Sequence, residues 1–145
     1  LVEATADTVT PAQRLEALTR EGTPQPIEVP YETRNGCRVL DVQTLVRSLA
    51  ALADDASAAN VAATAQHALA NGLATIAVNA AAYRTVERIG FTGGVAYNDA
   101  ISRQVRTTVT AADYPYLEPE IVPPGDGGIA YGQAIVATAR EAPGD

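Results

Sequence analysis

Two short segments each place a pair of glycines where an extended, apolar run passes into a helical pattern. The first reads TGGVAYN over residues 92–98, and the second reads PPGDGG over residues 123–128. Glycine has no Cβ, so the N–H groups of such a turn can come close to an anionic ligand, and the N-terminus of the following helix is electropositive. Two such turns in series are predicted to form two walls of one nucleotide cleft.

The rest of the chain alternates between helical and extended patterns, which predicts an α/β layer with parallel neighbouring strands. Helices are predicted over residues 12–20, 42–52, 58–83, 97–107 and 127–140, the first three with N-caps at Thr10, Asp41 and Ser57. The extended segments are a predicted β-hairpin about the Asn35-Gly36 turn and predicted strands over residues 85–91 and 120–122. In the long helix, apolar side chains at helical spacing form a predicted packing stripe: Val61, Ala65, Ala68, Leu69, Leu73, Ile76 and Ala80.

The charge balance bears on possible partners. The formal net charge is −7, and all ten basic residues are arginines. Binding to nucleic acid or to an anionic membrane surface needs clustered positive charge, so neither partner is predicted. An acidic, lysine-free and alanine-rich composition is typical of a halophile or of another organism with a GC-rich genome.

The single cysteine, Cys37, cannot form an internal disulfide, and the sequence has no hydrophobic signal segment. Together these features predict a cytoplasmic protein. The sequence begins at Leu1 instead of methionine, so we expect a fragment of a longer protein. Residues 1–10 are polar and are predicted to be a frayed lead-in, and residues 11–141 are predicted to form the folded lobe.

Gly93, Gly94 and Asn98 are the first candidate site residues. Backbone donors and a helix N-terminus at this turn could face the phosphate or ribose of a nucleotide. The alternative is a tight strand-to-helix turn in which Asn98 caps the following helix. Spacing alone leaves both interpretations open.

Asp126 is the second candidate, held on a stiff loop by glycines and prolines directly before a helix. A carboxylate there can bind a hard metal or a nucleotide-bound cation, although helix starts also prefer aspartate as a cap, and spacing alone favours the cap. His67, the single histidine, is predicted to pack or to hydrogen-bond, because one histidine makes no metal cluster. For the remaining candidates packing is the favoured interpretation, and no catalytic role is assigned: Cys37, Tyr114, Tyr116 and Tyr131.

Five segments, taken in order, resemble the C-terminal part of the HypF family, the carbamoyltransferases of nickel–iron hydrogenase maturation. They read PAQRLEAL, VLDVQTLVRSL, AATAQHALANGLATIA, TGGVAYN and VPPGDGGIAYGQAIVA. The likeness covers the chain from about residue 11 to residue 139, and the DGG loop is its most specific part. Two departures leave the nucleotide preference open, since Gly125 replaces the usual asparagine and Tyr97 replaces the usual glutamine.

The resemblance implies an RNase H-like lobe of the actin, sugar kinase and heat-shock protein (ASKHA) fold, with a mixed sheet packed with helices. The lobe is incomplete relative to the two-lobe fold, in which ATP lies between the halves. The resemblance also implies that Gly93, Gly94 and Asn98 contact the nucleotide. It implies that Asp126 is the one metal ligand from this half. With the resemblance, the interpretation of Asp126 as a metal ligand is favoured over its interpretation as a helix N-cap.

The implied cofactors are ATP and a divalent metal (Mg, Zn or Fe). HypF-like proteins use ATP and carbamoyl phosphate to carbamoylate the C-terminal cysteine of HypE. A HypE-like acceptor and the N-terminal half of the parent chain are therefore the implied partners. The His-x-x-x-His pair and the other modules of the family do not occur in these residues, so we expect the chain alone to be inactive.

Two other classes remain open at this point. One is a non-catalytic interaction module derived from the same fold, in which both glycine turns are architectural. The other is a relative of the tRNA threonylcarbamoyltransferases, which carry a GGVAAN element but end in a TDN loop in place of the DGG loop.

Overall fold

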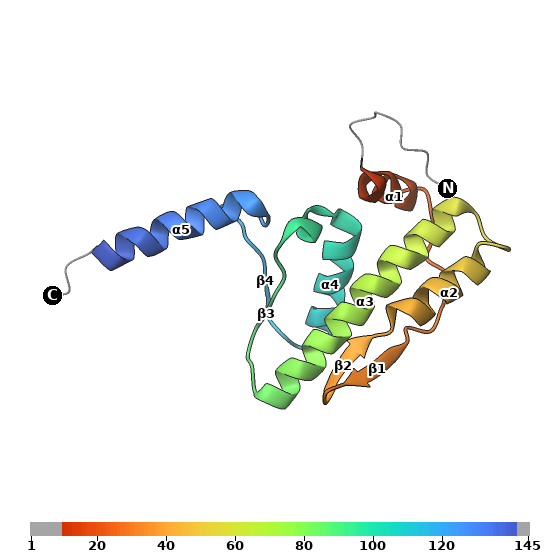
Figure 1. Cartoon of the computed structure of the whole chain (residues 1–145), viewed down its shortest axis with the longest axis horizontal. Helices are drawn as coiled ribbons and strands as arrows, with labels where there is room; N and C mark the ends of the chain where they lie inside the picture. The colour runs from red at the N-terminus through yellow and green to blue at the C-terminus, as the bar shows by residue number, and fades with distance from the viewer. Residues whose placement is uncertain (1–9, 142–145) are drawn as a thin grey trace.

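The computed structural model describes residues 10–140 and the backbone of residue 141. The predicted lead-in at residues 1–10 therefore falls, apart from Thr10, outside the described residues. Figure 1 shows the long helix α3 (Ala58–Arg84) running through the body of the molecule. Three helices pack against it: α1 (Pro11–Thr19), α2 (Val42–Leu52) and α4 (Asp99–Ala111). The last helix, α5 (Asp126–Glu141), extends away from this body.

The three predicted N-caps are confirmed. Thr10 and Gln13 form a reciprocal capping box at the start of α1, with Pro11 in the first turn. The carboxylate of Asp41 accepts a hydrogen bond from Thr44 N (3.0 Å), and Ser57 Oγ accepts one from Asn60 N (3.2 Å). Each cap satisfies a backbone N–H that the helix itself cannot pair.

The predicted hairpin is also confirmed. Strands β1 (Tyr31–Arg34) and β2 (Cys37–Leu40) pair antiparallel, with Tyr31 opposite Leu40 and Arg34 opposite Cys37. Asn35 (φ 51°) and Gly36 (φ 77°) both have positive φ, as a two-residue turn that matches the strand twist requires.

An extended connector leads from α1 to the hairpin along α3. Its prolines carry no N–H, but two of its other amides donate hydrogen bonds to side chains of α3. Thr23 N bonds to Asn60 Oδ1 (2.9 Å), and Gln25 N bonds to Thr64 Oγ1 (2.8 Å). These bonds explain why α3 carries polar residues on a face that the connector covers.

The core lies between α3 and α4 and is built from small side chains. Its buried members are Ala70, Ala74, Ala81, Ile89, Ile101, Val105 and Val109. Ile101, Val105 and Val109 of α4 are all buried in this core. The small side chain of alanine lets the two helices approach closely.

The packing stripe predicted for the long helix is confirmed only in part, because four of its seven residues are half-buried: Val61, Ala65, Leu69 and Ile76. Only Ala68 of that stripe is fully buried, Leu73 is 45% exposed and Ala80 is exposed. The buried residues of α3 are Ala62, Ala63, Thr64, Gln66, Ala68, Ala70, Gly72, Ala74 and Ala81. Because α3 is covered by α4 on one face and by the connector and hairpin on another, close approach selects alanine and glycine over leucine there.

The strands of the described part of the chain form two separate two-stranded sheets, not the one mixed sheet that the resemblance implies. Besides the hairpin, one parallel pair forms between β3 (Ile89–Gly90) and β4 (Tyr116–Leu117). Residues 120–122 are not a strand, and Ile121 is 94% exposed, because prolines flank this segment and no strand lies beside it. The general expectation of mixed helices and strands with a parallel pair is confirmed.

Two further boundaries differ from those predicted. A short 3-10 helix, η1 (Gly94–Tyr97), precedes α4, which then continues to Ala111 instead of ending near residue 107. None of the helices within residues 10–141 combines the length and the apolar character needed to cross a membrane.

Candidate functional site

The two glycine segments begin 31 residues apart in the chain, at residues 92 and 123, and lie side by side. The carbonyl oxygen of Pro124 accepts hydrogen bonds from Gly93 N (2.7 Å) and from Thr92 Oγ1 (2.8 Å). The backbone of the second segment is thus fixed directly to the turn of the first. The two segments are therefore in direct contact, whereas the prediction that they form two walls of one nucleotide cleft stays a prediction.

Two glycines of the second segment are explained by close packing. A Cβ on Gly125 would lie 2.6 Å from Cε2 of the Tyr97 ring, and a Cβ on Gly128 would lie 2.4 Å from the carbonyl oxygen of Pro123. Both distances are shorter than any normal contact, so neither position accepts a larger residue without movement. The tyrosine ring therefore takes up the room that the glycine at 125 leaves.

Gly93 and Gly94 are different, because a Cβ on either one would meet no atom within 4 Å. Gly93 has φ 106° and ψ 175°, a conformation that in practice only glycine adopts. Gly94 does not have positive φ, so neither its backbone nor the described residues around it require glycine. The outer side of the turn is open at Gly94, as close approach of a ligand would need.

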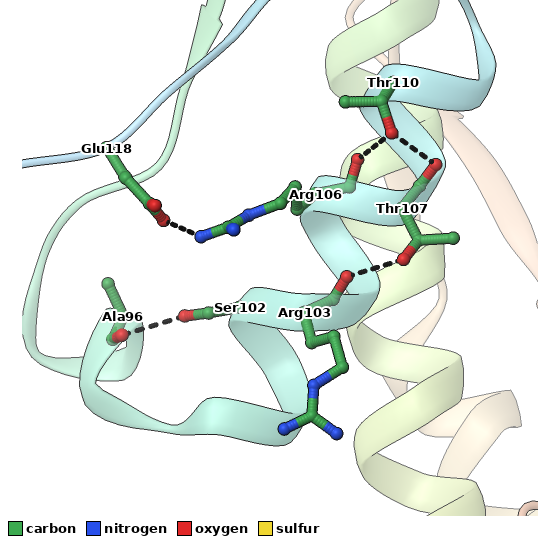
Figure 2. Close-up of polar contacts among 7 residues, drawn as sticks. All are labelled: Ala96, Ser102, Arg103, Arg106, Thr107, Thr110 and Glu118. Atoms are coloured by element: carbon green, nitrogen blue, oxygen red, sulfur yellow. Dashed lines mark hydrogen bonds and ion pairs between the residues drawn. The ribbon is translucent and has the colours of Figure 1, made fainter.

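Asn98 caps α4, so the capping interpretation is confirmed. Its Oδ1 accepts a hydrogen bond from Ile101 N (3.0 Å). Ser102 Oγ donates to the carbonyl oxygen of Ala96 (2.8 Å), which ties the first turn of α4 to η1 (Figure 2). The Nδ2 group of Asn98 takes no part in the capping bond. A nucleotide contact by Asn98 stays a prediction.

A hollow of about 700 Å³ lies between α1, α3 and the glycine turn. It is lined by Thr10, Ala12, Gln13, Leu15, Glu16, Ala65, Gln66, Leu69, Gly94, Val95, Tyr97, Asn98 and Ile101. Its volume falls within the range of small-molecule and cofactor sites, and mostly apolar walls with a few polar groups are typical of them. Two of the predicted site residues, Gly94 and Asn98, face this hollow.

Gln66 is the residue of this hollow that sequence reasoning missed. It is only 4% exposed, and its Oε1 has no hydrogen-bond partner among the described residues. The signal was its spacing, because Ala62, Gln66 and Ala70 fall on one face of α3 and all three are buried. A polar residue between alanines on one face of a helix is therefore the pattern that could have pointed to Gln66.

Asp126 lies in the exposed first turn of α5. A capping side chain would accept a hydrogen bond from a backbone N–H of the first turn, but the carboxylate of Asp126 accepts none from the described residues. Residues 10–141 also contain no group of three or more His, Cys, Asp or Glu side chains that could hold a metal. No such metal site is therefore complete within the described residues, and a metal-binding role for Asp126 stays a prediction.

The other candidates fall outside this unit. His67 is exposed beside a second hollow of about 380 Å³ along the connector, so its predicted packing role is wrong. Cys37 is exposed on β2 and does not fill a core position. Tyr114 and Tyr116 pack against the core as expected, whereas Tyr131 is 53% exposed on α5.

Arg106 on α4 contacts β4 and the residue that follows it. Its guanidinium forms an ion pair with Glu118 (Figure 2) and lies 5.4 Å from the centre of the Tyr116 ring. Burial, together with the nearby carboxylate of Glu118, raises the pKa of Tyr116. In Figure 2 the side chain of Arg103 instead extends away from the helix, with no interaction drawn to it.

Comparisons with known proteins agree on one family. Residues 8–133 match the family model "Carbamoyltransferase, Kae1-like Domain, second subdomain". The chain is 36% identical over 105 residues to the carbamoyltransferase HypF homolog of Cupriavidus necator, covering 70% of this chain and 27% of that protein. It is 34% identical over 67 residues to the probable carbamoyltransferase HypF of Methanocaldococcus jannaschii, covering 46% of this chain and 9% of that protein.

Two solved structures are similar to this chain. The crystal structure of HypF from T. kodakarensis is similar with a TM-score of 0.79 and 32% identity, over 92% of this chain and 17% of that one. A full-length HypF in a phosphate- and nucleotide-bound form is similar with a TM-score of 0.77 over 90% of this chain and 17% of that one. Its identity is 20%, so this second likeness concerns the fold.

Proposed function

This chain belongs to the HypF carbamoyltransferase family, as its Kae1-like second subdomain, and on that premise we propose that it forms one wall of an ATP site. In this proposal the turn at Gly93 and Gly94 faces the nucleotide phosphates. Asn98 caps α4 through Oδ1, and its Nδ2 group is free to donate a hydrogen bond to the nucleotide. The lobe is RNase H-like and supplies half of an ASKHA-type cleft.

One observation supports the proposal most strongly, namely the open space at Gly94. Glycine there is required neither by positive φ nor by a neighbouring atom. The short helix η1 begins at Gly94, so backbone N–H groups at the start of a helical turn lie beside this open space. Both features favour a bound anion such as a phosphate group.

Asp126 is proposed as the single metal ligand from this lobe. It is exposed, its carboxylate is unpaired among the described residues, and the loop before it is bonded to the glycine turn through Pro124. A carboxylate is a suitable ligand for Mg²⁺ and is also found at Zn²⁺ and Fe sites. When bound, such a metal would neutralise and orient phosphate oxygens.

For the intact protein we propose the reaction of its family. ATP and carbamoyl phosphate would be used to carbamoylate the C-terminal cysteine of a HypE-like acceptor in the cytoplasm. The residues described here contribute binding and orientation of the nucleotide, and the remaining chemistry belongs to other parts of the protein.

The proposal is tested by isothermal titration of the intact protein that contains this chain with ATP, in Mg²⁺ and in EDTA. Gly94→Val is expected to weaken ATP binding at least about tenfold, because its side chain fills the open side of the turn. Asp126→Ala is expected to remove the dependence of affinity on Mg²⁺.

Matched controls are Gly132→Val, another glycine with open surroundings but on α5, and Asp55→Ala, an exposed carboxylate between α2 and α3. Both are expected to bind as the wild type does. If Gly94→Val and Asp126→Ala also bind like the wild type, both turns are architectural and the interaction-module alternative replaces this proposal.

A further inference from the structure

We propose that Gln66 reads the base of the bound nucleotide by accepting a hydrogen bond from the 6-amino group of adenine. The inference rests on the proposed function, because it concerns the same site, and it adds a residue that determines which nucleotide is bound.

The first argument is position. Gln66, on α3, and Gly94, in the glycine turn, line the same hollow of about 700 Å³. A ligand whose phosphates lie against the turn can therefore place another part of itself against Gln66. That part is the base, because the surrounding walls include Leu69, Val95 and Ile101, which suit a flat, largely apolar ring.

The second argument is the unpaired oxygen. Gln66 is only 4% exposed, and its Oε1 has no hydrogen-bond partner in the described part of the chain. Buried polar groups are nearly always hydrogen-bonded, and leaving an acceptor unpaired destabilises the fold. The χ3 torsion of glutamine is soft, so the carboxamide can turn its oxygen towards a donor that enters the hollow. A base edge that donates to Oε1 and accepts from Nε2 would pair both atoms of the turned carboxamide, whereas the fold alone leaves Oε1 unpaired.

The third argument is the pattern of donors on the base. Adenine presents a donor at N6 and an acceptor at N7 on one edge, and the carboxamide of glutamine matches both. Guanine presents two acceptors on that edge, O6 and N7, so the oxygen of Gln66 would stay unpaired. The chemistry of Gln66 therefore selects adenine over guanine.

The experiment compares ATP with purine riboside triphosphate, which lacks only the 6-amino group, by titration into the intact protein. The wild type is expected to bind ATP about tenfold more tightly, as one hydrogen bond to a buried acceptor implies. Gln66→Leu is expected to bind both nucleotides equally, at about the affinity that the wild type has for the analogue. Gln43→Leu, an exposed glutamine on α2, serves as the control and is expected to keep the preference.

Urea unfolding distinguishes recognition of the base by Gln66 from a purely structural role of this residue. Gln66→Leu removes an unpaired buried acceptor, so the nucleotide-free protein is expected to unfold at a higher urea concentration than the wild type. A lower midpoint would show that the amide stabilises the fold and would overturn the inference.

A wild type that binds ATP and the analogue equally, or a Gln66→Leu variant that keeps the preference, overturns the inference but leaves the ATP site intact. A wild type that binds neither nucleotide overturns both.

Discussion

Gly93 and Gly94 are neighbours, but only Gly93 has a backbone conformation that needs glycine, and this difference can be measured. At φ 106° and ψ 175°, an alanine at position 93 is strained by about 1–3 kcal/mol. If the turn relaxes to relieve that strain, it loosens the 2.7 Å hydrogen bond from Gly93 N to Pro124 O, which contributes about 0.5–1.5 kcal/mol. We therefore expect Gly93→Ala to lower the free energy of unfolding by about 1–3 kcal/mol.

Gly94→Ala is expected to act in the opposite direction. Its Cβ meets nothing within 4 Å and its φ is not positive, so the folded state carries no new strain. The alanine restricts the unfolded chain, and the free energy of unfolding should rise by about 0.4–1 kcal/mol.

Urea unfolding followed by circular dichroism measures both effects on the 145-residue chain, and the slope of the transition should stay unchanged. The reasoning is refuted if Gly93→Ala is as stable as the wild type. It is equally refuted if Gly94→Ala loses as much stability as Gly93→Ala, since glycine at 94 would then be structural.

Three further variants test the packing and the charges of the same body. Gly22→Ala places a Cβ 2.0 Å from the carbonyl oxygen of Ala59 and should cost about 1–3 kcal/mol in urea unfolding; an unchanged midpoint would contradict the contact. Val109→Ala empties a position that is 0% exposed and should cost about 2–3 kcal/mol in the same assay, whereas a loss below about 1 kcal/mol would mean that the core closes around it. The hydroxyl of Thr44 donates a hydrogen bond to the carboxylate of Asp41 (2.6 Å) and lowers the pKa of that carboxyl. The ionised carboxylate therefore stabilises the fold fully above the ordinary carboxyl pKa, and this stabilisation is lost as the pH falls through the lowered pKa. Unfolding of the wild type and of Asp41→Asn from about pH 5 to about pH 2 should show a weaker pH dependence in the variant, and equal curves would contradict the assignment.

The parts of the fold that could be predicted from the sequence are those decided by a few neighbouring residues. Thr10, Asp41 and Ser57 cap helices because their own side chains reach the next N–H groups. Asn35 and Gly36 form the hairpin turn because both tolerate positive φ. None of these outcomes depends on a distant element.

Burial could not be predicted in the same way, because it depends on which element lies opposite. Leu73 points away from the body while Ala70 and Ala74 are buried, since α4 approaches α3 at the alanines. On α2, Val42 and Val46 are each 56% exposed although they fit the apolar spacing that buries Leu45. Helical periodicity shows that a face is apolar, but it does not show what covers that face.

The residues of the candidate site also differ in whether local sequence or tertiary packing identifies them. Gly93, Gly94 and Asp126 were proposed from local glycine and proline patterns, and the structure joins their two loops by a hydrogen bond from Gly93 N to Pro124 O. Gln66 was missed, because its importance comes from the hollow that α1, α3 and the glycine turn enclose together. The roles of all of these residues toward a nucleotide or a metal stay predictions.

The central claim, that a nucleotide lies against the glycine turn and the adjoining hollow, is tested most directly by amide hydrogen exchange. The intact protein is compared with and without saturating ATP and Mg²⁺. The account predicts slower exchange at residues 93–98 and on α3 around residue 66, with no change in the hairpin at residues 31–40. Saturating ATP that slows exchange elsewhere but leaves residues 93–98 unchanged would contradict the account.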